Sequence, residues 1–127
     1  MARHIENYED LSHEARELIL YMENERAWHD AIMWVNGTLA RHWVNNAFNL
    51  DLGIKAFQHA TMSAAKQYHL EHGTMSNSFA SVFPKHVRAE VCELLARTFV
   101  AIVRQPAVWG DLGERAVKVL SKGMVAR

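Results

Sequence analysis

Apolar residues recur along most of the chain at the spacing of an α-helix. The first stripe runs from Leu11 to Met22, with one apolar residue every three or four positions. Continuing it would require apolar residues where the chain has Glu25 and Arg26. A second stripe, rotated from the first, begins at Ala27. The pattern therefore predicts two successive helices with a break near residue 24.

Polar residues with short side chains mark where these helices should begin and end. Asp10 or Ser12 is the expected N-cap of the first helix, and Asn24 that of the second. Apolar spacing carries the second helix on to about Phe48. A turn follows, after which Asp51 is the expected N-cap of a third helix.

Glycine and proline delimit the remaining helices. The third helix should stop at His72 and Gly73, because glycine readily adopts the left-handed residue that ends many helices. Pro84 suits the first turn of a fourth helix and Pro106 ends it. A short fifth helix is expected over residues 111–123.

Together these features predict an all-α protein, a compact bundle of about five helices forming a single helical domain over residues 1–127. Strong helix formers dominate, and β-branched residues nowhere alternate with polar ones for long. We expect a core made by one residue or more of each stripe, namely Leu18, Trp28, Ile32, Phe57, Val91, Leu94, Leu95 and Ile102.

Composition narrows the class of protein. Half of the 127 residues are apolar and 22% are charged, which excludes intrinsic disorder. The single cysteine excludes an internal disulfide framework. No apolar run approaches the roughly 20 residues that span a bilayer, and the N-terminus has no apolar signal core. We expect a soluble, cytoplasmic protein that does not enter a membrane.

Eight histidines raise the question of a metal site. The closest pair, His69 and His72, can share one helix face, but zinc needs three or four ligands. Near a helix C-terminus, histidines more often complement free carbonyl groups. We therefore predict no metal and no cofactor, and keep a histidine-based metal protein as a minor alternative.

Catalytic motifs are also missing from the sequence. Cys92 lies between Glu90 and Glu93 on an apolar helix, which favours a buried, unreactive thiol. The sequence has no glycine-rich phosphate loop and no nucleophile elbow. We predict that the protein is not an enzyme.

Charge is balanced overall but unevenly distributed. Lys and Arg number 14, as do Asp and Glu, yet residues 1–30 carry a net charge of −5 and the remainder +5. The acidic end would suit a partner with a basic surface. The basic end supports an alternative hypothesis, a helical DNA-binding regulator, whose contact residues would be Arg115, Lys118 and Lys122.

The stretch from Ala31 to Val35 is apolar all the way round a helix. His29 and Asp30 mark a solvent-facing side one turn earlier, which makes Met33 and Trp34 the best candidates for an exposed patch; ordinary packing in the core is the alternative. Exposed Trp and Met are typical of protein–protein contacts. The predicted partner-binding residues are this pair and the acids near them in sequence: Met33, Trp34, Glu14, Glu17, Glu23 and Glu25.

Ala56, Ala60 and Ala64 form a stripe of small residues that lets another helix approach closely. Packing within the chain is the expected use, and a homodimer seam the alternative. The predicted function is a small non-enzymatic protein that binds another macromolecule as an adaptor, inhibitor or regulator. The short chain would suit an accessory protein of a phage or mobile element that acts on host machinery.

Overall fold

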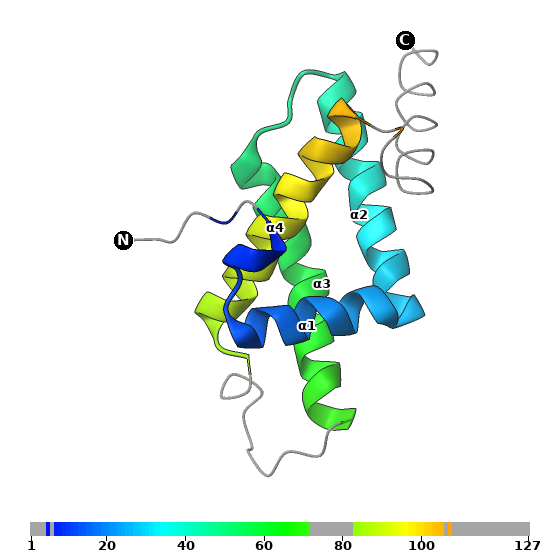
Figure 1. Ribbon diagram of the computed structural model, residues 1–127. Coiled ribbons are helices and arrows are strands. Elements are labelled where there is room, and N and C mark those ends of the chain that lie inside the picture. Colours follow the sequence, from blue (N-terminus) through cyan, green and yellow to red (C-terminus); the bar gives the residue numbers. More distant parts are fainter. Residues whose placement is uncertain (1–4, 6, 72–82, 106, 108–127) are drawn as a thin grey trace.

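The computed structural model describes Ile5, residues 7–71, residues 83–105 and Ala107. These residues form a single-turn 3₁₀ helix, Tyr8–Asp10, and four α-helices: α1 (His13–Asn24), α2 (Arg26–Val44), α3 (Leu50–Glu71) and α4 (Lys85–Arg104). The all-α prediction is confirmed, with one helix fewer than expected. The predicted fifth helix lies outside the described residues. In Figure 1, α1 crosses the bundle at a steep angle to α2, α3 and α4.

The boundary between α1 and α2 falls where the sequence places it. Ser12 is the N-cap of α1, and its hydroxyl accepts a hydrogen bond from the Ala15 backbone N–H at 3.3 Å. The prediction that Asn24 caps α2 is wrong, because Asn24 is the last residue of α1. Glu25 occupies the N-cap position, and its side chain makes no capping hydrogen bond.

α2 ends at Val44, about one turn before the predicted end near Phe48. Asn46 adopts a left-handed backbone with φ of 60°, a conformation that asparagine tolerates better than most residues. The Ala47 N–H reaches back to the His42 carbonyl at 2.8 Å, and the Asn46 N–H reaches the Trp43 carbonyl at 3.0 Å. This pair of bonds is the Schellman arrangement, which closes a helix even without glycine.

α3 begins at Leu50, two residues earlier than predicted, so Asp51 lies in its first turn rather than at its N-cap. The Asn49 side-chain oxygen accepts a hydrogen bond from the Leu52 N–H at 2.8 Å and supplies the cap. Pro84 is the N-cap of α4, one position before the first turn where we expected it. Its fixed φ of −66° leads directly into the helix.

The core is centred on α4, which packs most extensively against α3. Seven of the eight predicted core residues are buried. Trp28 is the exception, since it is only partly buried and its indole hydrogen-bonds the Tyr21 hydroxyl. An indole N–H needs a polar partner, which explains why the ring stays at the edge of the core.

Small residues bring α3 and α4 together. A Cβ atom added to Gly53 would meet the Cβ of Ala96 at only 3.1 Å. Ala60 and Ala64 are also buried inside the chain, at 7% and 0% exposed. Two of the three residues of the alanine stripe therefore pack within one molecule, which is the expected use of that stripe.

Candidate functional site

The N-terminal segment formed by Ile5 and residues 7–12, here called the strap, crosses the surface of α4. Ile5 and Leu11 are buried, at 1% and 2% exposed. The backbone N–H of Ser12 donates to Glu90 Oε1 at 2.7 Å. The strap is thus fixed to α4 by two apolar side chains and by hydrogen bonds to carboxylates.

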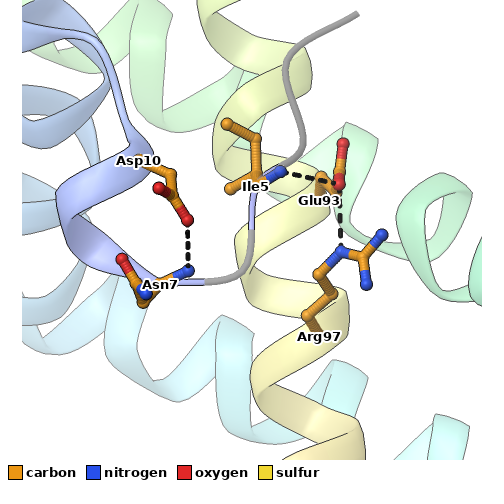
Figure 2. A network of polar contacts seen from close by, with 5 residues as sticks. All are labelled: Ile5, Asn7, Asp10, Glu93 and Arg97. Atoms are coloured by element: carbon orange, nitrogen blue, oxygen red, sulfur yellow. Dashed lines mark hydrogen bonds and ion pairs between the residues drawn. The ribbon is translucent and has the colours of Figure 1, made fainter.

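Figure 2 shows the second of these carboxylate contacts. The Ile5 N–H donates to Glu93 Oε2 at 3.3 Å, and the same oxygen accepts from Arg97 Nε at 3.0 Å. Within the strap, the Asn7 N–H donates to Asp10 Oδ2 at 3.2 Å. The sequence indicates that Glu90 and Glu93 lie beside Cys92 and that Glu93 can pair with Arg97 one turn later, but it does not predict their contacts with the strap. Glu90 and Glu93 accept hydrogen bonds from backbone N–H groups that lie 78 and 88 residues earlier in the chain. No pattern in the sequence indicates such distant contacts.

A hollow of about 520 Å³, here called the strap cavity, lies between the strap, α1, α2 and α4. Its size falls within the usual range for sites that bind small molecules. Aliphatic side chains from three helices form much of its wall, and polar groups lie among them. The lining residues are Asn7, Tyr8, Ile19, Glu23, His29, Ile32, Asn36, Leu94, Leu95, Arg97, Thr98, Ala101 and Ile102.

Burial affects two of the polar groups around the strap cavity, Asn36 and Glu23. The Asn36 side-chain oxygen is buried and has no hydrogen-bond partner among the described residues. Partial burial raises the pKa of Glu23, while the charge of His29 acts in the opposite direction. An unsatisfied buried carbonyl oxygen costs free energy, so Asn36 lowers the stability of this part of the fold.

A second, more open hollow of about 390 Å³ lies between α1 and α3 and is here called the acidic groove. Carboxylates and tyrosines dominate its lining: Glu17, Leu20, Tyr21, Asn24, Glu25, Tyr68 and Glu71. The rings of Tyr21 and Tyr68 meet edge to face with their centres 5.3 Å apart. Leu20, which is 43% exposed, adds an apolar edge.

Each tyrosine of the acidic groove donates to a carboxylate on the opposite helix. The Tyr21 hydroxyl donates to Glu71 at 2.9 Å, and the Tyr68 hydroxyl donates to Glu17 at 3.3 Å. Burial raises the pKa of both phenols, and these carboxylates raise it further. The groove therefore presents acceptor oxygens beside aromatic faces, a combination that suits Lys or Arg side chains.

Trp34 points away from the bundle. It is 73% exposed, the most of any large hydrophobic residue described, whereas Met33 is only partly exposed. The buried residues of α2 occupy the opposite side of the helix. Exposure of Trp34 follows from the helical phase of its neighbours, as the sequence predicts.

The structure does not bring the predicted binding residues into one hollow. Glu17 and Glu25 share the acidic groove, and Glu23 lines the strap cavity instead. Glu14 is exposed in the first turn of α1 and lines neither hollow. Trp34 also lines neither of them. The residues of the DNA-binding alternative, Arg115, Lys118 and Lys122, lie outside the described residues.

Cys92 is 2% exposed and close to Thr61 Oγ1, at 3.5 Å. Burial raises the pKa of its thiol, so the protonated form is favoured, as expected for an unreactive cysteine. In the described part of the chain, no three His, Cys, Asp or Glu side chains are grouped as metal ligands. His72, one of the closest histidine pair, lies outside that part.

Comparisons with protein-family models, curated proteins and solved structures find no match to this chain. Among the described residues, no helix combines the length and apolar character needed to cross a membrane.

Proposed function

We propose that the protein is a non-catalytic interaction protein that binds another protein through Trp34. The exposure of this indole carries the proposal, because 73% of a large aromatic side chain faces solvent on a well-packed helix. Trp is among the residues that most often dominate binding energy when a partner buries them. In this proposal the protein acts as an adaptor, inhibitor or regulator.

The distribution of charge supports a partner with a basic surface. Glu17 and Glu25 lie together in the acidic groove, on a different part of the surface from Trp34. Charges need not touch the partner to accelerate association, since their field acts over about 8 Å at physiological salt. We assign Trp34 the role of anchor and the acids the role of steering the encounter.

The proposal extends to cellular context. The only cysteine is buried and unpaired, which is typical of proteins in reducing compartments, and we place the protein in the cytoplasm. A small helical protein that acts by binding alone resembles accessory proteins of phages and mobile elements in kind. Self-association through Trp34 is the homo-oligomeric version of the same proposal.

The test compares Trp34→Ala with Leu70→Ala, since Leu70 is also highly exposed, at 71%, but lies on α3. Each variant and the wild type are used to capture proteins from the native host, and the captured proteins are quantified. The proposal requires that at least one host protein is captured by the wild type and by Leu70→Ala but not by Trp34→Ala. With that protein purified, Trp34→Ala should weaken binding by about 30-fold or more.

Sedimentation of wild type and Trp34→Ala tests the homo-oligomeric version. If no captured protein and no self-association depends on Trp34, the proposal is wrong. Glu17→Gln combined with Glu25→Gln should slow association and reduce its salt dependence without changing dissociation.

A further inference from the structure

A third hollow lies where α2 ends, α3 begins and α4 ends, at one end of the bundle (Figure 1). It has a volume of about 570 Å³ and is here called the aromatic hollow. Sites for small molecules of this size typically combine an apolar wall with a few placed polar groups. The wall of the aromatic hollow includes apolar side chains from each of the three segments and two arginines: Trp43, Phe48, Leu50, Val100, Arg97 and Arg104.

The aromatic part of this wall is held in place from behind. The ring centres of Trp43 and Phe48 lie 5.5 Å apart, with the ring planes tilted by 49°. The fully buried Phe99 packs against both, with its ring centre 6.2 Å from that of Trp43 and 5.2 Å from that of Phe48. A Cβ atom added to Gly53 would meet the Phe48 ring at 3.1 Å, so this ring also lies close against α3. A wall that is already fixed loses little conformational entropy when a ligand binds.

The exposed parts of the wall favour an aromatic ligand. Trp43 and Phe48 are only partly buried, so each ring keeps some surface toward the hollow. Aromatic rings gain energy beyond simple burial when they pack edge to face or in offset stacks. Leu50 and Val100, also partly buried, add aliphatic surface for the rest of the ligand.

The charged groups of the lining favour an anion. Arg104 is exposed, and it has no hydrogen-bond or ion-pair partner among the described residues. Arg97 is partly exposed and donates through Nε to Glu93 at 3.0 Å (Figure 2), so this pair is close to neutral. No Asp or Glu is among the described residues that line the hollow. Arg104 is therefore an uncompensated cation, and a guanidinium group matches the geometry of a carboxylate.

We propose that the aromatic hollow binds a small aromatic carboxylate. The ring packs against Trp43 and Phe48, and the carboxylate pairs with Arg104. An arginine has five N–H donors, so Arg97 can donate to the ligand as well as to Glu93. This site is additional to the protein-binding surface proposed at Trp34, which does not line the hollow.

The probe is 2-naphthoate, and its control is 2-naphthamide, which has nearly the same size and shape but no charge. Calorimetric titration of the full-length protein should show saturable binding of 2-naphthoate. The amide should bind at least tenfold more weakly, because it cannot form the charge-assisted hydrogen bonds of the carboxylate.

Arg104→Gln tests the partner of the carboxylate. Binding of 2-naphthoate should weaken about fivefold or more, whereas binding of 2-naphthamide should stay within about twofold. Arg26→Gln is the matched control, because it removes the same charge from an exposed arginine that does not line the hollow. This control should leave the binding of both probes within about twofold of the wild type.

Ala101→Trp tests the location. Ala101 is exposed and lines the hollow, so a large side chain there obstructs it without replacing a core residue. Ala89→Trp is the matched control, because Ala89 is exposed on the same helix and does not line the hollow. Binding of 2-naphthoate should fall at least tenfold in the first variant and stay within about twofold in the second.

Any one of four results would overturn the proposal. The first is absence of saturable 2-naphthoate binding to the wild type, and the second is equal binding of 2-naphthoate and 2-naphthamide. The third is an equal effect of Arg104→Gln and Arg26→Gln on 2-naphthoate binding. The fourth is equal binding of 2-naphthoate by Ala101→Trp and Ala89→Trp.

Discussion

The two sides of α4 that face α3 and α2 are packed in different ways. Toward α3, Gly53 and Ala96 allow the helices to approach until an added Cβ would lie 3.1 Å from its neighbour. Toward α2, contact is sparse, and the strap cavity separates parts of the two helices. Small side chains on both partners permit close packing. Where large aliphatic and polar side chains face each other instead, the helices leave a hollow between them.

Truncating large side chains should give the largest difference in unfolding free energy between the α3 side and the α2 side of α4. Phe57 is fully buried on α3, so Phe57→Ala should lower the free energy of unfolding by about 3–5 kcal/mol. Leu95 borders the strap cavity, so part of its surface already lacks neighbours. Leu95→Ala should lower the free energy of unfolding by about 2 kcal/mol, the low end of the range for a buried leucine. Urea denaturation measures both, and a greater loss for Leu95→Ala would contradict this view of the packing.

Enlarging an alanine should have opposite effects on the two sides. Ala96→Leu inserts volume where α3 is in contact, and we expect a loss of about 1–3 kcal/mol. Ala101→Leu adds apolar surface at the strap cavity and should be neutral or slightly stabilising. Both changes are made on α4, so helix propensity is matched. Equal destabilisation in urea melts would show that the cavity side is as tightly packed as the other.

Loss of the Glu93 carboxylate should loosen the strap and leave the α3 side intact. Glu93→Leu removes the acceptor of the Ile5 N–H, at an expected cost of about 1 kcal/mol. Hydrogen exchange at Ile5 should accelerate about fivefold, whereas exchange at Ala96 should change no more than global stability requires. Glu9→Leu is the control, because the Glu9 side chain is exposed and contributes no acceptor to α4. Acceleration at Ile5 in the control as well would argue against a specific anchor.

The smallest effect concerns the pH dependence contributed by the strap cavity. The folded protein raises the pKa of Glu23 above its ordinary value of 4.5, so ionisation is less favourable in the folded than in the unfolded chain. Stability is therefore lost as the pH rises from the unfolded to the folded pKa. Glu23→Gln should raise the melting temperature slightly at pH 7, and the gain should vanish below about pH 4.

Glu14→Gln is the matched control for this last change, since Glu14 lies on the same helix outside both hollows. An equal gain in both variants would indicate relief of general acidic repulsion along α1. A loss in Glu23→Gln at pH 7 would mean that the attraction of His29 outweighs the cost of burial.

Much of the fold could be predicted because its causes are local. Helical periodicity alone places Leu18 and Ile32 on the apolar faces of their helices, because it depends only on neighbouring residues. Both residues are buried. The break between α1 and α2 follows from Glu25 and Arg26, which interrupt the apolar stripe. Errors occurred where two adjacent residues compete for a cap, as at Asn24 and Glu25, or where asparagine takes the role of glycine, as at Asn46.

The candidate sites could be predicted only in part. Helical phase alone places Trp34 opposite the buried face of α2, so its exposure is a property of the sequence. Sequence proximity did not predict that the acids of residues 14–25 would be divided between two hollows. Glu23 belongs to the last turn of α1, whereas Glu25 has an extended backbone between α1 and α2, so the two side chains leave the chain in different directions. They line the strap cavity and the acidic groove, respectively.

The sequence by itself therefore determined helix content, the buried face of each helix and the exposure of Trp34, because these depend on neighbours a few residues apart. Only the tertiary structure brought Glu90 and Glu93 to the backbone of the strap, and placed Asn36 beside a cavity built from three helices. Such contacts depend on the angles and distances between helices. Those are set by side-chain volumes at crossings between segments far apart in the chain, which no local pattern encodes.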